Sequence, residues 1–316
     1  MLDPMIQALL QRVPQLTSYV IWEKSPAEAR ADFKRFSLFA APKDLPIGKV
    51  ENVMAGTIPL RSYSPVAGGT ELLPGIVFFH GGGFVLGDLD CYDALCRTLA
   101  NESGCRVISV DYRLAPEHPF PAAVEDGFAA LQWLEDHATE LCVDANSIAV
   151  AGDSAGGNLA ALLCQKAKAN GSSPNICFQL LFYPALRLDV SLQSASDTDP
   201  AIGTGFPLDL RALNWFHRMY VPEDVDPADP GLSPLFAPDL TGLPPAYIVT
   251  AGLDHLRADA IAYAERLKQA GVAVVHVDYE TMIHGFISMQ GLIPLATSAI
   301  AAAAHAVHQA LADGES

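Results

Sequence analysis

Short apolar runs alternate with helical patterns along most of this chain, and that alternation limits its possible folds more than any other feature. Runs rich in Val, Ile and Phe predict buried strands at residues 75–80, 106–112, 147–151, 176–183, 246–251 and 273–279. Helical patterns lie between them at residues 90–103, 121–137, 154–170 and 256–270. Because a strand, a helix and a further strand form a right-handed crossover, we expect an α/β fold with a mostly parallel sheet flanked by helices.

Two further segments complete this plan. Residues 49–63 predict an antiparallel hairpin at one edge of the sheet, which brings the expected total to eight strands. The alanine-rich residues 294–312 predict a closing helix.

Residues 1–45 and 186–222 do not follow the alternation. The first segment predicts two helices, and the second of them begins with Ser-Pro-Ala-Glu at 25–28, a capping box with proline at the first helical position. The other segment is polar and rich in glycine and proline before an aromatic helix at 208–220. Each segment is compatible either with a lid over the carboxyl ends of the strands or with ordinary surface helices, and the pattern leaves these two interpretations open.

Composition narrows the class of protein. With 316 residues and 50% hydrophobic content, the chain can form one large domain with a sizeable core. Its net charge of -17 argues against binding to nucleic acid or to anionic membrane surfaces, because both need basic patches. The negative net charge also repels acidic substrates, so a small neutral substrate is expected.

The sequence predicts a cytoplasmic protein without stable membrane association. Residues 1–11 lack the basic region and apolar core of a secretion signal. No apolar stretch reaches the ~20 residues that span a bilayer. The 6 cysteines show no paired Cys-x-x-Cys spacing, so we expect reduced thiols rather than disulfides or a metal site.

The motif Gly-Asp-Ser-Ala-Gly at 152–156 lies between a predicted strand and a predicted helix. A serine on so sharp a turn is held with its hydroxyl facing a cleft, and small neighbours are needed because larger side chains would collide with the strand and helix. In this context the motif predicts that Ser154 is a nucleophile.

A nucleophilic serine needs a base, and the base needs an orienting carboxylate. His284 follows the last predicted strand on a loop with Gly285, where loops converge on the cleft of an open α/β sheet. Asp254 follows the preceding strand, so we expect it to accept the N–H of His284. Asp259 is interpreted as a solvated helix charge, and Asp278 as a strand residue that faces away from His284. Other histidines lie in helices, within a strand or beside turns: His118, His137, His217, His255, His276, His305 and His308.

The tetrahedral intermediate of such a reaction needs hydrogen-bond donors for its oxyanion. The motif His-Gly-Gly-Gly at 80–83 follows a strand, and its glycines allow backbone N–H groups to turn toward a ligand. The N–H of Ala155 is a further expected donor. A nucleotide site is the rival interpretation, but residues 81–87 do not fit G-x-G-x-x-G and no Gly-Lys-Ser/Thr follows. The polar block 111–119 is interpreted as structural support for the glycine loop.

Together these motifs resemble those of the hormone-sensitive lipase-like carboxylesterases, the bacterial esterase family IV of the α/β-hydrolases. The resemblance covers roughly residues 49–290. It implies an α/β-hydrolase domain at 46–316 with a helical cap built from 1–45 and 186–222. It also implies the catalytic triad Ser154, Asp254 and His284, and an oxyanion hole formed by the N–H groups of Gly82, Gly83 and Ala155.

One departure from the family is visible at 254–258. The family's acid motif is usually Asp-Pro-Leu-Arg-Asp, whereas this chain has Asp-His-Leu-Arg-Ala. The triad acid is retained, but His255 has no role that the sequence assigns.

The expected function is therefore that of a carboxylesterase acting on short-chain acyl esters through an acyl-enzyme, without metal or cofactor. Amidase or deacetylase action on acylated amines shares this machinery and stays open. A non-catalytic small-molecule receptor on the same scaffold is the third hypothesis, but such relatives tend to lose the base. The resemblance also implies a homodimer. Acyl-chain length depends on whether Phe206, Trp215 and Phe216 block the pocket or pack within the cap.

Overall fold

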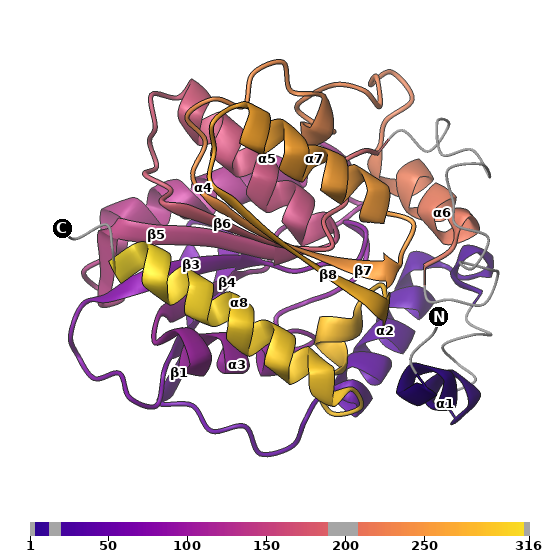
Figure 1. Ribbon diagram of the computed structural model, residues 1–316, viewed down its shortest axis with the longest axis horizontal. Coiled ribbons are helices and arrows are strands. Elements are labelled where there is room, and N and C mark those ends of the chain that lie inside the picture. The colour runs from indigo at the N-terminus through magenta and orange to yellow at the C-terminus, as the bar shows by residue number, and fades with distance from the viewer. Residues whose placement is uncertain (1–3, 13–19, 189–207, 313–316) are drawn as a thin grey trace.

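A computed structural model describes residues 4–12, 20–188 and 208–312 (Figure 1). Within these residues the strands form one eight-stranded sheet in the order β1-β2-β4-β3-β5-β6-β7-β8. β1 and β2 form the expected edge hairpin, and β2 also pairs antiparallel with β4. All other neighbours are parallel, which confirms the predicted mostly parallel α/β sheet.

The strands lie close to their predicted positions. Their bounds are Lys49–Ala55 (β1), Ile58–Ser64 (β2), Leu73–Phe79 (β3), Arg106–Val110 (β4), Val143–Asp153 (β5), Phe178–Phe182 (β6), Ala246–Leu253 (β7) and Val274–Ile283 (β8). β4 and β6 are buried along their whole length. Strands covered on both faces need apolar side chains at successive positions, which explains why they appear in the sequence as continuous apolar runs.

Helices cover both faces of the sheet (Figure 1). Their bounds are Asp93–Ser103 (α3), Ala122–His137 (α4), Ala155–Ala169 (α5), Arg257–Gln269 (α7) and Pro294–Ala312 (α8). α3 and α8 pack together on one face, whereas α4, α5 and α7 lie on the other. Two apolar cores result, one on each face.

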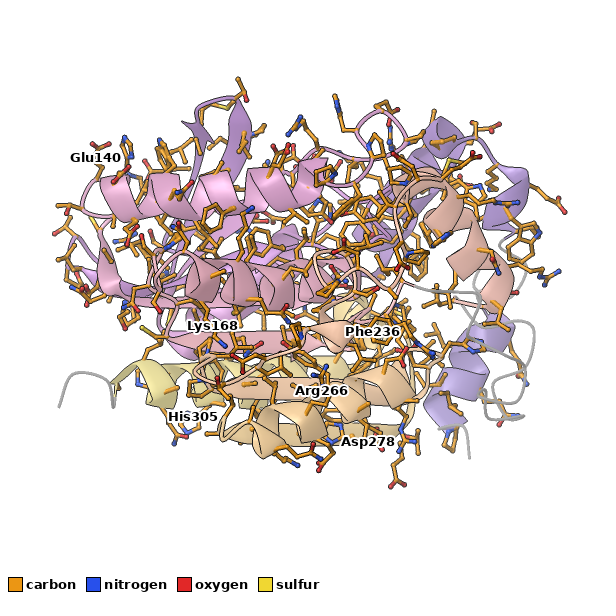
Figure 2. All side chains as sticks on the ribbon, turned by 90° about the horizontal axis from the view of Figure 1, so that it is seen from above. Glu140, Lys168, Phe236, Arg266, Asp278 and His305 are labelled. Atoms are coloured by element: carbon orange, nitrogen blue, oxygen red, sulfur yellow. The ribbon has the colours of Figure 1, made fainter. Side chains whose placement is uncertain are left out.

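Other helices lie beyond the carboxyl ends of the strands (Figure 1). They are α1 (Pro4–Arg12), the short 3-10 helix η2 (Ile21–Glu23), α2 (Pro26–Ala40) and α6 (Leu210–Tyr220). Two short 3-10 helices, η4 (Pro234–Phe236; Phe236 is labelled in Figure 2) and η5 (Phe286–Met289), complete the helices of the described residues. The predicted capping box starts α2: the N–H of Glu28 donates to Ser25 Oγ over 3.4 Å, and the N–H of Ser25 donates to Glu28 Oε2 over 3.0 Å. The part of the expected cap at 189–207, including Phe206, lies outside the described residues.

Arginine side chains join these helices to one another and to the sheet. Arg30 of α2 donates to the carbonyl oxygens of Val85 and Ala115, each over 2.8 Å, in the segments that follow β3 and β4. The guanidinium of Arg211 on α6 lies 4.0 Å from the ring centre of Trp22 in η2, a cation–π contact. No helix in the described ranges has both the length and the apolarity to cross a bilayer.

Candidate active site

Ser154 occupies a strained turn between β5 and α5. Its φ is 54° and its ψ is -116°, a conformation that a residue with a side chain rarely adopts. Hydrogen bonds hold the turn: the N–H of Ser154 donates to Phe182 O, and the N–H of Ala185 donates to Ser154 O. A Cβ at Gly156 would lie 1.8 Å from Phe79 O, so only glycine fits where α5 crosses the end of β3. The motif thus has the strand–turn–helix context that the sequence predicted.

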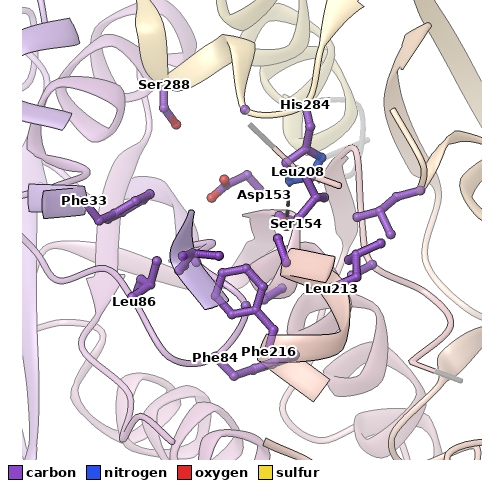
Figure 3. Close-up of a pocket in the computed structure, with 18 of the residues that line it drawn as sticks. Phe33, Phe84, Leu86, Asp153, Ser154, Leu208, Leu213, Phe216, His284 and Ser288 are labelled. Carbon is purple, nitrogen blue, oxygen red and sulfur yellow. Dashed lines mark hydrogen bonds between the residues drawn. The ribbon is translucent and has the colours of Figure 1, made fainter. Parts of the chain in front are cut away.

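The structure brings Ser154, His284 and Asp254 together in one hydrogen-bonded chain (Figure 3). His284 Nε2 lies 3.0 Å from Ser154 Oγ, and His284 Nδ1 lies 2.7 Å from Asp254 Oδ2. β7 ends directly before Asp254, and β8 ends directly before His284. Because the carboxyl ends of neighbouring parallel strands meet at one edge of the sheet, residues distant in sequence lie side by side.

Burial and hydrogen bonds fix the roles available to these three groups. The Asp254 side chain is fully buried, and its Oδ1 accepts the N–H of Leu256 over 2.9 Å. An ionised carboxylate can only accept, so His284 Nδ1 carries a proton and Nε2 is left to accept the proton of the serine hydroxyl. The ring of Tyr183, centred 4.7 Å from that of His284, supports the imidazole from one side. Sequence reasoning did not identify Tyr183, because a tyrosine at a strand end has no distinguishing pattern.

The glycine loop after β3 faces the same cavity as Ser154. Gly82 has a φ of 111°, which favours glycine, and its Cβ would lie 2.3 Å from Leu86 O. Gly82, Gly83 and Ala155 all line the cavity. Among the residues that the structure describes, the N–H groups of these three find no acceptor. They are therefore available to a ligand.

One carboxyl group connects this loop to the serine turn. The N–H of Gly81 donates to Asp153 Oδ1 over 2.7 Å, and the hydroxyl of Tyr92 donates to Asp153 Oδ2 over 3.2 Å. Burial raises the pKa of Asp153 to about 7, because the ionised form loses its hydration. The role of Asp153 was not identified from the sequence, although it lies within the serine motif.

The polar block 111–119 supports the loop, as the sequence predicted. The Tyr112 hydroxyl donates to His80 O over 2.6 Å, and the two rings stack with centres 4.3 Å apart. The N–H of Ala115 donates to Phe84 O over 2.9 Å. Burial lowers the pKa of His80 to about 4, so this histidine is neutral and structural.

The other carboxylates near the triad have structural partners. Asp278 accepts from Arg257 and from Thr250 Oγ1, over 2.6 and 2.7 Å, and takes no part in the His284 chain. The prediction that Asp259 is a solvated charge is wrong. Asp259 is only 6% exposed and pairs with Arg187 Nε at 3.1 Å. Its partner is 72 positions away, so the helical pattern around Asp259 could not indicate it.

His255 is half-buried beside Asp254. Its Nδ1 is buried without a hydrogen-bond partner among the described residues. Burial lowers the pKa of His255 more than the neighbouring Asp254 carboxylate raises it. His255 is therefore a neutral neighbour of the triad rather than a second base in hydrogen-bond contact with it.

Ser154 opens into a cavity of about 780 Å³ (Figure 3). Side chains of α2 and α6 line it together with the glycine loop, including Phe33, Leu213 and Phe216. In the described part of the chain, no group of three or more His, Cys, Asp or Glu side chains could hold a metal ion. The cysteines there are free thiols.

Comparison with known proteins identifies the family to which this chain belongs. Residues 76–288 match the α/β hydrolase fold family, so the chain belongs to that family. The ester-hydrolase EH1AB1 from the metagenome of Lake Arreo has 40% sequence identity and a TM-score of 0.91, over 98% of this chain and 99% of that one. The Pyrobaculum calidifontis esterase has 39% identity and a TM-score of 0.87, over 98% and 99% of the two chains.

Curated relatives refine the assignment. Carboxylesterase NlhH of Mycobacterium tuberculosis is 39% identical over 98% of this chain and 96% of its own length. The carboxylic ester hydrolase LipN of the same species is 48% identical over 74% of this chain, and that match spans 62% of LipN. These relatives confirm the predicted membership of the hormone-sensitive lipase-like esterases.

Proposed function

We propose that this chain is a carboxylesterase that hydrolyses short-chain esters of neutral acids and alcohols through an acyl-enzyme. The observation that carries the proposal is the hydrogen-bonded chain of Ser154, His284 and Asp254 beside three backbone N–H groups that have no acceptor among the described residues. A triad that is intact and bonded also favours an enzyme over a receptor on the same scaffold.

In the first half of the reaction, Ser154 Oγ attacks the ester carbonyl carbon while His284 Nε2 takes the hydroxyl proton. Asp254 stabilises the imidazolium that forms and keeps its tautomer. The N–H groups of Gly82, Gly83 and Ala155 then donate to the oxyanion. When the C–O bond breaks, His284 returns the proton to the leaving alcohol, and the acyl group stays on Ser154.

In the second half, water replaces the alcohol. His284 takes a proton from the water as its oxygen attacks the acyl carbon, and the same N–H groups stabilise the second oxyanion. Collapse releases the carboxylic acid and returns the proton to Ser154. Every proton transfer uses the imidazole, so the cycle needs no metal or cofactor.

We further propose that residues 46–316 form the catalytic domain and that 1–45 and 186–222 form a cap. The contribution of α2 and α6 to the cavity walls supports a cap over ordinary surface helices. Phe216 supports a short acyl chain, because its ring lies against the backbone of Gly83.

The Ser154→Ala variant tests the proposal. We expect its kcat/KM for p-nitrophenyl butanoate to fall by about 10⁴-fold or more, because nucleophile removal leaves only binding and oxyanion stabilisation. An alkyl phosphonate should label the wild-type enzyme at Ser154 and leave this variant unlabelled. The control is Ser173→Ala, since Ser173 is exposed and its side-chain hydroxyl donates to Glu135. Undiminished hydrolysis by Ser154→Ala would refute the proposal.

A further inference from the structure

The glycine loop after β3 continues into Phe84, whose backbone lies in the left-handed region. Its φ is 63°, a conformation that a bulky side chain rarely adopts. Phe84 directly follows Gly82 and Gly83, whose N–H groups are the proposed oxyanion donors. A residue persists in such a conformation only where its surroundings determine it. The contacts of Phe84 therefore influence which way the neighbouring N–H groups face.

The side chain of Phe84 stacks on Tyr220, the last residue of α6. The two ring centres are 3.8 Å apart, and the angle between the ring planes is 6°. Each residue is only 2% exposed. Stacked aromatic rings bury a large apolar area, so the contact holds the orientation of both side chains.

The hydrogen bonds of the loop engage its carbonyl groups and leave the donors free to turn. Gly82 O accepts the N–H groups of Val85 and Leu86, over 3.1 and 2.9 Å, and Phe84 O accepts the N–H of Ala115 over 2.9 Å. The N–H groups of Gly82 and Gly83 have no acceptor in the described part of the chain. The stack on Phe84 is thus a restraint on the left-handed turn that the backbone hydrogen bonds do not supply.

α6 contacts the loop a second time, one turn before Tyr220. A Cβ on Gly83 would lie 2.2 Å from the ring of Phe216, so this ring rests directly on Gly83. Phe216 and Tyr220 are four positions apart and therefore lie on the same face of the helix. Figure 3 shows Phe84 and Phe216 on the same side of Ser154. The same face of α6 thus packs on two successive residues of the loop.

The ring of Tyr220, rather than its hydroxyl, makes the contact. Tyr220 O accepts the N–H of Phe120 over 2.9 Å, and the ring of Phe120 meets that of Tyr220 edge-on at 6.1 Å. The Tyr220 hydroxyl is buried and has no hydrogen-bond partner within the described ranges. A phenylalanine at position 220 should therefore hold Phe84 equally well.

We propose that Tyr220 is a positioning residue of the oxyanion hole: its ring holds Phe84, and thereby keeps the N–H groups of Gly82 and Gly83 turned toward the oxyanion. This inference rests on the proposed esterase function and gives α6 a part in the chemical step besides its place in the cavity wall. Donors that are aligned in advance act mainly on the transition state. Loss of the stack should therefore lower kcat and leave KM close to its wild-type value.

Three variants test this role with p-nitrophenyl butanoate. In Tyr220→Leu we expect kcat to fall about tenfold, less than the ~10²–10³-fold cost of removing an oxyanion donor outright. Tyr220→Phe keeps the stack and should keep the wild-type kcat. The matched control is Tyr263→Leu, which removes another fully buried tyrosine ring, on α7. It should lower stability without lowering kcat.

A pair of inhibitors separates aligned donors from an altered cavity shape. With trifluoromethyl pentyl ketone, Ser154 Oγ bonds to the carbonyl carbon, His284 takes the serine proton, and the carbonyl electron pair moves to oxygen as an oxyanion. The alcohol with the same carbon skeleton fills the cavity but forms no oxyanion. We expect Tyr220→Leu to weaken inhibition by the ketone about tenfold and inhibition by the alcohol less than about twofold.

Phe84→Leu removes the same stack from the side of the loop. It should reproduce the loss of kcat, and the double variant should lose no more than either single variant, because both changes remove one interaction. Phe84→Leu takes the place of Tyr220→Leu if the latter does not fold.

The outcomes distinguish this inference from the proposed function. An unchanged kcat in the variants without the stack, equal weakening of the ketone and the alcohol, or a loss in Tyr220→Phe as large as in Tyr220→Leu would each refute the role of Tyr220 while the esterase function stands. If the wild-type protein does not hydrolyse the butanoate ester, the function itself is refuted.

Discussion

Asp153 contacts both halves of the candidate active site. It precedes Ser154 in the chain, and its carboxyl group accepts the N–H of Gly81 at the start of the glycine loop. The position is 3% exposed, so water cannot stabilise a negative charge there. The hydrogen bond from Gly81, the nearby His284 and the longer contact from Tyr92 offset only part of that loss, and the pKa of Asp153 rises to about 7.

This raised pKa predicts a specific dependence of stability on pH. In the unfolded chain the carboxyl group releases its proton near its ordinary pKa of 3.8, whereas in the folded protein it keeps the proton until about pH 7. Between these values the folded state binds more protons, so the contribution of Asp153 to the free energy of unfolding falls as pH rises.

Asp153→Asn removes this titration and keeps an oxygen to accept from Gly81. We expect the variant to gain stability relative to the wild type from about pH 4 to about pH 7, by up to about 4 kcal/mol, and the difference to level off above that. Urea unfolding at a series of pH values measures it. A difference that does not vary with pH would mean that Asp153 titrates normally.

The candidate site could be predicted from sequence where a residue's role follows from its place at a strand end. Ser154, Asp254 and His284 each follow an apolar run, and strand ends converge in a parallel sheet. Asp259 and Tyr183 could not be interpreted in this way. Tertiary packing brings Arg187 to Asp259 and the His284 ring to Tyr183 from distant parts of the chain.

At the scale of elements, α2 is positioned both by contacts within its own first turn and by contacts with segments distant in the sequence. The capping box at Ser25 and Glu28 sets where the helix begins. Arg30 then fixes where the helix lies, since its guanidinium reaches two carbonyl oxygens and forms a forked pair with Glu117. The carbonyl groups belong to segments beside the glycine loop, so one side chain sets the distance between α2 and the candidate oxyanion hole.

Arg30→Ala should therefore loosen α2 without unfolding the sheet. We expect KM for butanoate esters to rise several-fold with a smaller change in kcat, because the wall of the cavity moves while the triad is untouched. Hydrogen exchange should accelerate in α2. The matched control is Lys268→Ala, which breaks the exposed ion pair with Glu265 on α7 and should change neither quantity. Equal exchange in Arg30→Ala and the wild type would contradict this account of α2.

Sequence patterns predicted the bounds of helices and strands better than they predicted which of these elements lie side by side. The closing helix has the predicted bounds, and α6 begins two positions after the predicted start at 208. β5 begins at Val143 rather than 147, because pairing with Leu73 of β3 extends it through polar residues. The placement of β4 between β2 and β3 has no counterpart in local patterns, since strand order depends on contacts across the whole sheet.

At the scale of the whole molecule, the net charge of -17 produces a negative field that acts beyond individual contacts. The basic side chains that line the cavity are paired with carboxylates, Arg187 with Asp259 and both Lys24 and Arg35 with Asp32, so they oppose that field only locally. Long-range repulsion and the cost of removing a carboxylate from water both disfavour an anionic ester. Only the first depends on salt, because mobile ions screen exposed charges at a distance.

This distinction gives a test that separates the two effects. Methyl succinate half-ester and methyl succinamate have nearly the same shape, but only the first is charged. We expect the anionic ester to have a kcat/KM about tenfold lower or more at low salt. The gap should narrow as the Debye length falls from about 30 Å at ~0.01 M to about 3 Å at ~1 M salt, while the rate for the neutral amide serves as the control. The gap that persists at high salt measures desolvation in the cavity. A gap that is the same at both salt concentrations would show that the cavity alone, and not the charge of the molecule, excludes anions.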